Sequence, residues 1–394
     1  MKEVVIVSGA RTPIGTMGGA MKDVHAADLG AAAIKEAVAR AGISQGNVDE
    51  VVFGNVGQVA ENAFIARMCA IRAGLSTSST ALTVNRLCGS GLQAVNTAVA
   101  TIRTGDAEVV VAGGTENMDL LPYYVRKARY GYRMGHAQLE DGLTLALSDP
   151  FRNYAMGCTA ENLADRYGIS RREQDEFALR SQENAIRAMD SGLFKDEIVP
   201  VEVPQRKGEP LLVDTDEHPR RDTSLEKLAK LKPAFREGGS VTAGNSSGIN
   251  QGAAAVVIMS ADKAAELGLK PMVRVTEYAV GGVDPDVMGI GPVVAVRKLL
   301  KKTGLKLDDF DLIELNEAFA AQSLAVIREL GLDPEKVNPN GGAIALGHPI
   351  GATGAILTVK AMYDMKRRGL RRALVTLCIG GGQGIATVLE NCEN

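Results

Sequence analysis

The composition of this chain excludes several classes of function. Its 394 residues are 45% hydrophobic, which is enough to bury more than one core. The 44 basic and 47 acidic residues give a net charge of only −3, and aromatic residues make up 4%. We therefore expect no nucleic-acid partner, because such proteins carry a strongly basic surface.

The spacing of the cysteines and the length of the apolar runs indicate the cellular compartment that we expect for this chain. The cysteines do not have the spacing of a disulfide framework or a zinc site, so we expect a reducing, cytoplasmic environment and no bound metal. After Met1 the chain soon enters the short apolar run Val4–Val7, and no apolar run approaches the roughly 18 residues of a membrane helix. We expect no membrane partner. The cysteines are Cys69, Cys88, Cys158, Cys378 and Cys392.

In the first 120 residues, short β-branched runs alternate with alanine-rich stretches. This alternation is typical of α/β proteins and predicts a mainly parallel sheet with helices on both faces. The expected strands are Val4–Val7, Val51–Phe53 and Glu108–Ala112, and the expected helices are Ala26–Ala41 and Gly91–Ile102.

The same order recurs after about residue 270. Cys88 follows Asn55 by 33 residues, and His348 follows Asn316 by 32. We interpret this as an internal duplication, with 1–120 (completed by 244–270) as the N-terminal half and 271–394 as the C-terminal half. The expected elements are strands Val273–Val275, Asp311–Leu315 and Ala373–Leu377, with helices Val293–Lys301 and Gly351–Arg368.

The pattern changes between residues 121 and 243. Tyrosines and basic residues are concentrated in Tyr123–Arg133, and an amphipathic helix over Ser170–Asp190 begins with a capping box of Ser170 and Glu173. We predict an inserted loop domain here, which serves as a lid or in substrate recognition. The run Gly252–Ser260 then returns to the first core as a strand.

Cys88 is the first candidate for chemistry. It lies within Asn85–Gly91, just before the helical run Leu92–Ile102, where the helix dipole favours a thiolate. A lone cysteine is more often a small buried apolar residue. The Gly-Ser-Gly that follows argues for function, since glycine lets backbone N–H groups approach a reacting atom.

His348 is the second candidate. Pro349 suits a first helical turn, and a helix N-terminus disfavours imidazolium, so we expect a neutral imidazole that accepts a proton. A helix-capping histidine is the alternative.

Two strand ends carry further candidates. Cys378 precedes Gly380–Gly382 and is either a general acid or base or a core cysteine. Asn316 and Glu317 follow a buried strand, where α/β sheets bind ligands, although Asn316 could instead cap the next helix. Two thiols and an imidazole beside glycine-rich turns indicate acyl transfer through a thioester.

With these segments assembled, the chain closely resembles the thiolase family, and within it the short-chain acetyl-CoA acetyltransferases. The resemblance implies a duplicated core in a layered α/β/α/β/α arrangement. It also implies a reversible Claisen condensation of two acetyl-CoA to acetoacetyl-CoA plus coenzyme A, within fatty acid metabolism. The family uses coenzyme A thioesters as substrates, holds no permanent cofactor, and forms homodimers or homotetramers. The matching segments are Asn85–Gly91, Gly244–Gly248, Asp284–Gly289, Asn316–Ala320, Gly341–Gly354 and Cys378–Gly384.

The resemblance also implies residue roles. Cys88 would take the acyl group, His348 its proton, and Cys378 the proton at the α-carbon of the second acetyl-CoA. His348 and a water held by Asn316 would serve one oxyanion, and the N–H groups of Cys88 and Gly380 the other. Coenzyme A would lie along the middle section. The matching substrate positions are Arg220, Phe235, Ser247, Met156, Met288 and Phe319.

One position departs from the family pattern. Where short-chain thiolases have His-Met-Gly, this chain has Ala155-Met156-Gly157. The smaller Ala155 suggests the hypothesis that acyl chains longer than acetoacetyl are accepted. One alternative is therefore a 3-ketoacyl-CoA thiolase of fatty-acid β-oxidation. A separate alternative is a non-catalytic acyl-CoA-binding relative.

Overall fold

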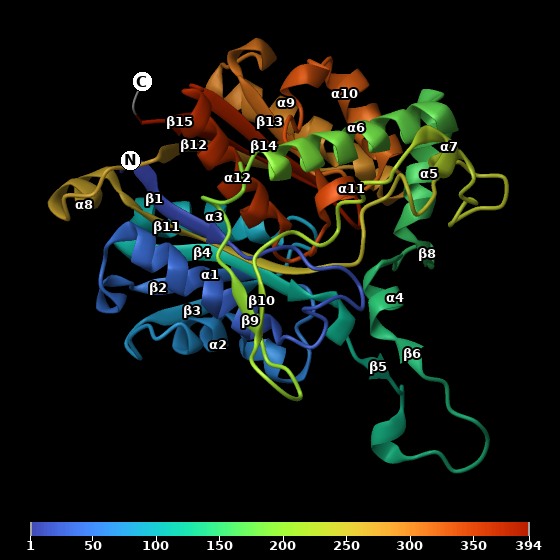
Figure 1. Ribbon diagram of the computed structural model, residues 1–394, viewed down its shortest axis with the longest axis horizontal. Helices are drawn as coiled ribbons and strands as arrows, with labels where there is room; N and C mark the ends of the chain where they lie inside the picture. Colours follow the sequence, from blue (N-terminus) through green and yellow to red (C-terminus); the bar gives the residue numbers. More distant parts are fainter. Residues whose placement is uncertain (1, 393–394) are drawn as a thin grey trace.

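A sheet of nine strands joins two similar halves of the chain in the computed structural model, which describes residues 2–392 (Figure 1). The strand order is β13-β14-β15-β12-β1-β11-β4-β2-β3. The first half supplies β1 (Val4–Arg11), β2 (Glu50–Gly54), β3 (Thr80–Val84), β4 (Val109–Asn117) and β11 (Gln251–Ser260). The second half supplies β12 (Val273–Gly282), β13 (Leu312–Leu315), β14 (Arg372–Ile379) and β15 (Gln383–Asn391).

The sheet is mixed, so the prediction of a mainly parallel sheet is wrong. β2 runs parallel to β3 and β4, and β13 runs parallel to β14. The pairs β1–β11, β1–β12, β4–β11, β12–β15 and β14–β15 are antiparallel. The turn Gly380–Gly382 is too short for a crossover, so β14 and β15 must form a hairpin.

The duplication is visible in the strand order. The first half reads β1-β11-β4-β2-β3 outward from the junction, and the second reads β12-β15-β14-β13. A parallel bridge from Ile313 to Val337 occupies the place that β3 has in the first half. The two halves meet where Val5 and Ile6 of β1 pair with Arg274 and Val273 of β12.

Successive side chains of the strands point to opposite faces of the sheet, so helices pack on both faces and the molecule has five layers, as predicted. Val4 and Ile6 face a central core, whereas Val5 and Val7 face an outer one. The central core holds helices α3 (Ser90–Thr104) and α12 (Thr353–Arg368). The outer layers are α1 (Ala26–Ala41) with α2 (Ile65–Arg72), and α9 (Gly291–Thr303) with α10 (Ala320–Leu330).

The two central helices cross closely at their first turns. A Cβ on Gly91 would lie 2.7 Å from the Ala355 nitrogen, and one on Gly354 would lie 2.2 Å from the Leu92 nitrogen. Glycine is therefore required at both positions, because any side chain would force the helices apart. This crossing brings the loops that precede the two helices to the same end of the sheet.

The middle section contains helices as well as loops. The capping box of Ser170 and Glu173 is present and begins α6. The strands β5 and β6 lie in an arm that projects from the body of the molecule (Figure 1). The boundaries 121 and 243 of a separate domain stay a prediction. The elements are α4 (Gly142–Ala146), α5 (Met156–Tyr167), α6 (Arg171–Asp190) and α7 (Leu225–Ala229), with β5 (Tyr123–Tyr124), β6 (Glu140–Asp141), β7 (Ser148–Asp149), β8 (Tyr154–Ala155), β9 (Val201–Val203) and β10 (Leu211–Val213). Two further short helices, α8 (Ala261–Glu266) and α11 (Ala343–Leu346), follow it.

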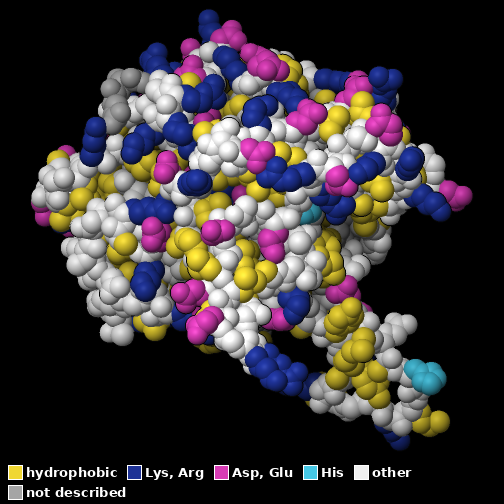
Figure 2. Space-filling model, in the orientation of Figure 1, with side chains coloured by type: hydrophobic (Ala, Val, Ile, Leu, Met, Phe, Trp, Pro, Cys, Tyr) yellow, Lys and Arg dark blue, Asp and Glu magenta, His cyan; other side chains and the backbone are white. Residues whose placement is uncertain are grey.

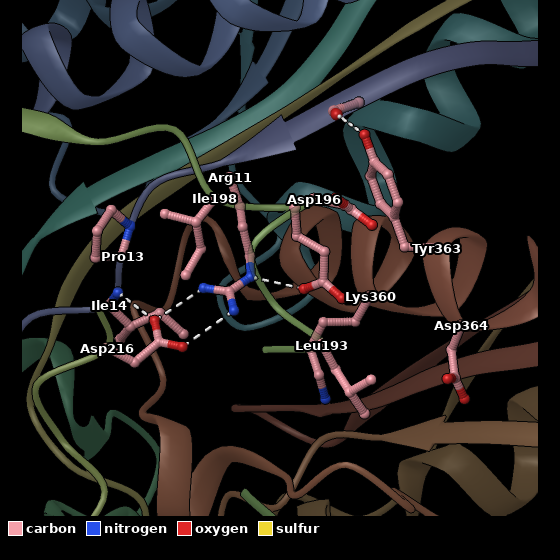
Figure 3. A network of polar contacts seen from close by, with 12 residues as sticks. Arg11, Pro13, Ile14, Leu193, Asp196, Ile198, Asp216, Lys360, Tyr363 and Asp364 are labelled. Atoms are coloured by element: carbon pink, nitrogen blue, oxygen red, sulfur yellow. Dashed lines mark hydrogen bonds and ion pairs between the residues drawn. The ribbon is translucent and has the colours of Figure 1, made fainter. Parts of the chain in front are cut away.

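A buried arginine ties the middle section to the core (Figure 3). Arg11, at the end of β1, donates from Nε to Glu197 at 3.0 Å and from Nη1 and Nη2 to Asp216 at 2.8 and 3.0 Å. All three side chains are almost fully buried. Since a buried charge is tolerated only when it is paired, these bonds anchor both ends of the β9–β10 hairpin to β1.

Candidate active site

A cavity of about 70 Å³ brings together residues from both halves and from the middle section. Cys88, Gly380 and His348 line it, and so do the predicted substrate residues Ser247, Met156, Met288 and Phe319. The rest of the lining is apolar, from Leu87, Ala146, Leu147, Ala318 and Ile350. The cavity is thus a mainly apolar chamber with a thiol and an imidazole in its wall.

A strained turn presents Cys88 to the cavity. Leu87 has a φ of +45°, a left-handed conformation that is costly for a leucine. The Ser90 hydroxyl closes the turn, because it accepts from the Arg86 N–H at 2.9 Å and donates to the Leu87 carbonyl at 2.6 Å. The strain is held by these bonds, so the direction of the thiol is fixed before substrate arrives.

The electrostatics of Cys88 differ from the sequence prediction. Burial raises the pKa of the Cys88 thiol to about 11, while the backbone N–H of Gly380 acts in the opposite direction. Helix α3 begins at Ser90, so Cys88 lies outside the first turn and the dipole does not outweigh desolvation. Burial thus opposes the helix effect that the sequence suggested, and we expect the thiol to need a base.

His348 is placed to be that base. The side chain is buried, and burial lowers the pKa of its imidazole to about 4, so it is neutral at pH 7. The neutral imidazole of His348 agrees with the prediction, but its cause is burial and not the helix N-terminus. Helix α12 begins at Thr353, so Pro349 is not in its first turn.

Hydrogen bonds assign the tautomer of His348. The Thr353 hydroxyl donates its proton to the Pro349 carbonyl at 2.9 Å, and its oxygen lies 2.6 Å from His348 Nδ1. Nδ1 therefore carries the proton and donates to Thr353. Nε2 is left as an acceptor, 3.4 Å from the Asn316 side-chain amide nitrogen. This is the nitrogen that can take a proton from a thiol.

Cys378 and Asn316 lie behind the cavity wall. Cys378, near the end of β14, is fully buried, and burial followed by the charge of a Cys88 thiolate raises its pKa well above the ordinary value. The two thiols are thus close enough to influence one another. Asn316 is also fully buried, and its Oδ1 has no hydrogen-bond partner within the protein.

Glu116 is a residue that the sequence analysis missed. Its buried carboxylate accepts from the Gly351 N–H at 3.0 Å, the Val56 N–H at 2.8 Å and the Asn55 side chain at 2.9 Å. It joins the loop after His348 to the first half. The sequence did contain a signal for Glu116, because it is an acidic residue at the end of a buried apolar strand. A charge at such a position needs a specific partner.

The remaining predicted residues lie outside the cavity. Phe235 packs edge-on against Phe319 with ring centroids 5.9 Å apart. Arg220 is exposed and lines a second cavity of about 160 Å³ with His218 and Lys227. Ala155 is the N-cap of α5 and is not among the residues lining the first cavity, although the next residue, Met156, is.

Residues 2–392 offer no candidate for a metal site or a membrane span. No cluster of His, Cys, Asp and Glu side chains in this part of the chain has the arrangement of a metal site. No helix within the same residues combines the length and the apolar character needed to cross a membrane.

Comparisons with known proteins agree along the whole chain. The thiolase N-terminal domain model matches residues 4–262, and the thiolase C-terminal domain model matches residues 269–391. The acetyl-CoA acetyltransferase of Syntrophomonas wolfei is 55% identical over 394 residues, which cover 99% of both chains. The beta-ketothiolase BktB of Cupriavidus necator is 54% identical over 391 residues, again 99% of both.

Solved structures of similar proteins also match this chain along its whole length. The acetyl-CoA acetyltransferase of Bacillus anthracis superposes with a TM-score of 0.98 at 49% identity and covers 99% of both chains. Human mitochondrial 3-ketoacyl-CoA thiolase in complex with CoA superposes with a TM-score of 0.95 at 46% identity, covering 99% of this chain and 98% of that one. From its sequence, its duplicated five-layer fold and its thiol–imidazole cavity, this chain belongs to the thiolase family of acyltransferases.

Proposed function

We propose that this chain is an acetyl-CoA acetyltransferase, which condenses two acetyl-CoA to acetoacetyl-CoA and coenzyme A and also runs the reverse thiolysis. The observation that carries this proposal is the cavity itself, where the Cys88 thiol and the His348 imidazole share a small, mainly apolar chamber. The names of the similar relatives support a short-chain substrate, since several are acetyl-CoA acetyltransferases. They do not favour the longer-chain alternative.

The first step transfers an acetyl group to Cys88. The sulfur attacks the thioester carbon of acetyl-CoA, a new S–C bond forms, and the bond to the coenzyme A sulfur breaks. His348 Nε2 takes the Cys88 proton during the attack and delivers it to the departing sulfur. The neutral thiol and the neutral imidazole of the resting site fit this order, because the proton moves only when substrate is present.

The second step forms the carbon–carbon bond. Cys378, after its own proton has passed to His348 Nε2, takes a proton from the α-carbon of a second acetyl-CoA, and that carbon attacks the acetyl group on Cys88. The Cys88 S–C bond breaks, and the proton held by His348 ends on the released Cys88 sulfur.

Donors for the oxyanions come from both loops. The Gly380 N–H is directed at the Cys88 sulfur and, with the Cys88 N–H, would face the oxygen of an acyl group held there. Asn316 would hold a water for the other oxyanion, which suits its buried, unpartnered Oδ1. His348 Nε2 can join as a donor after it has taken a proton.

Coenzyme A would extend from this cavity toward the second one. Ser247 lines the first cavity and would contact the pantetheine arm, with Phe235 behind Phe319. Arg220 and Lys227 in the second cavity offer positive charge to the phosphates of the nucleotide. No permanently bound cofactor is part of this proposal.

We also propose a homodimer or homotetramer. Strand β3 lies at the edge of the sheet and is largely accessible, which offers backbone groups for pairing with a second copy. The arm around β5 and β6 gathers exposed hydrophobic side chains (Figure 2), among them Tyr130 at 93% and Met134 at 95% exposure. Light scattering on the purified chain would test both states, and a monomer at micromolar concentration would contradict them.

The proposed location is the cytoplasm. The free thiols of Cys69, Cys88, Cys158, Cys378 and Cys392 suit a reducing compartment. Fractionation of the source cells would test this.

Trapping the acyl-enzyme tests the proposed function. The protein is mixed with radiolabelled acetyl-CoA, quenched in acid and digested. We expect label on the peptide that contains Cys88, and none in the Cys88→Ser variant, because a hydroxyl is far less ionised than a thiol. If wild-type protein carried no label, the catalytic proposal would fail and the non-catalytic alternative would be favoured.

A further inference from the structure

Two segments far apart in the sequence contribute apolar side chains to the cavity. Leu147 and Met156 flank the β7–β8 hairpin, and the Met156 N–H donates to the Leu147 carbonyl at 2.8 Å. Met288 comes from the 3₁₀ turn η5 (Pro285–Ile290). The separation between the hairpin and η5 therefore determines how much room lies between these three side chains.

One carboxylate joins the hairpin to η5. Asp286 accepts two parallel hydrogen bonds from Arg152, from Nε to Oδ1 and from Nη2 to Oδ2, both at 2.8 Å. The Tyr154 hydroxyl donates to the same carboxylate at 2.9 Å. A forked, charge-assisted contact of this kind fixes orientation as well as distance. We refer to Arg152 and Asp286 as the clamp.

Both sides of the clamp are held by their own elements. In the hairpin, the Asp149 carboxylate accepts from the N–H groups of Phe151 and Arg152 at 2.9 and 2.8 Å, so the turn that carries Arg152 is rigid. In η5, the Asp286 carbonyl accepts from the Asn162 side chain at 2.9 Å, which ties the turn to helix α5. Because the turn that carries Arg152 is rigid, loss of the contact between Arg152 and Asp286 should shift the hairpin as a whole.

We propose that the clamp determines the acyl chain length that this enzyme accepts. By holding the hairpin against η5, it keeps Leu147 and Met156 close to Met288 and limits the cavity to short acyl groups. The proposal rests on the proposed function, since it takes the cavity as the acyl site. Arg152 and Asp286 touch neither the thiol nor the imidazole, so they act through the cavity wall and are positioning residues.

The exposure of the clamp makes the proposal testable without loss of the fold. The Arg152 and Asp286 side chains are 57% and 33% exposed. Pairs this accessible contribute little to stability. The pair Arg297–Glu329 provides a matched control, because its exposures are 57% and 34% and it joins α9 to α10 in an outer layer.

The experiment compares specificity constants. kcat/KM for thiolysis is measured with four-, six- and eight-carbon 3-ketoacyl-CoA for wild type, Arg152→Ala, Asp286→Asn and the control Arg297→Ala. One methylene in an apolar pocket changes kcat/KM by roughly 10- to 200-fold, so a partly opened wall should raise the six-to-four-carbon ratio by about fivefold or more. Arg297→Ala should leave the ratio unchanged. The reversed pair, Arg152→Asp with Asp286→Arg, should move the ratio back toward the wild-type value.

Each outcome decides a different point. If the clamp variants kept the wild-type ratio while Cys88 was still acetylated, the clamp proposal would be wrong and the proposed function would stand. An equal fall for all chain lengths would also overturn it, because that pattern indicates general positioning rather than selection by length. If wild-type Cys88 could not be acetylated, the fault would lie with the proposed function.

Discussion

His348 Nδ1 lies 2.6 Å from the Thr353 hydroxyl oxygen, and this contact determines which imidazole nitrogen is free. With the Thr353 proton donated to the Pro349 carbonyl, we assign the imidazole proton to Nδ1 and the acceptor role to Nε2. The residue that gives the proposed base its correct tautomer is thus in the first turn of the following helix, five positions further along the chain.

Thr353→Val should impair proton transfer while preserving the shape of the side chain. Without a hydroxyl to accept Nδ1–H, the imidazole loses its preference for the useful tautomer. We expect kcat to fall by about 10- to 100-fold, since a positioned general base contributes roughly 100- to 10,000-fold. Thr353→Ser keeps the hydroxyl and should retain most of the activity.

Nitrogen-15 NMR of labelled histidine would check the cause directly. Wild type should show a protonated Nδ1 and an unprotonated Nε2 at His348, and Thr353→Val should show a mixture. An Nε2–H tautomer in the wild-type protein would contradict the assignment, whatever the effect on rate.

The reactivity of Cys88 should follow pH without a plateau near neutrality. Burial raises the pKa of the thiol to about 11, so the thiolate fraction should grow about tenfold per pH unit well below that value. The rate of iodoacetamide alkylation, followed by mass spectrometry on the Cys88 peptide, should therefore keep rising from pH 7 to pH 9.5. A rate that was already maximal at pH 7 would indicate a preformed thiolate–imidazolium pair.

Cys378→Ala should separate the two steps of the reaction. Acetylation of Cys88 needs His348 but not Cys378, so labelled acetyl-CoA should still modify the variant. Condensation needs a base at the α-carbon, and its rate should fall by about 100-fold or more. Formation of acetoacetyl-CoA at the wild-type rate would show that another group moves the α-proton.

Arg11→Met should destabilise the fold. It leaves the carboxylates of Glu197 and Asp216 without their buried cation, and breaking a buried pair in this way costs about 3–5 kcal/mol. Urea unfolding at a fixed protein concentration measures the change. Arg221→Ala is the control, because its pair with Asp190 is 60% and 56% exposed and should contribute little to stability. Equal effects of the two substitutions would mean that the buried network does not hold the middle section.

Local signals in the sequence were sufficient for much of the fold. Helix Ala26–Ala41 was predicted with its observed bounds, and the capping box at Ser170 began α6 as expected. The duplication was readable because nearly equal spacings, of 33 and 32 residues, placed Asn55 and Asn316 at matching strand ends. Strand direction was not readable in this way, because antiparallel strands such as β1 and β11 are buried on both faces and therefore read as continuous apolar runs, as parallel strands do.

The sequence by itself determined which groups are available: two thiols and an imidazole, each next to glycines that let backbone approach. Only the tertiary structure decided how those groups are charged and oriented. Burial, which depends on every layer around the cavity, raises the pKa of the Cys88 thiol, against the preference expected from the following helix. The tautomer depends on Thr353, and the cavity wall depends on Arg152 and Asp286, which are 134 positions apart in the chain. A pattern along the chain carries local preferences, whereas desolvation and contacts between distant segments arise only when the chain has folded.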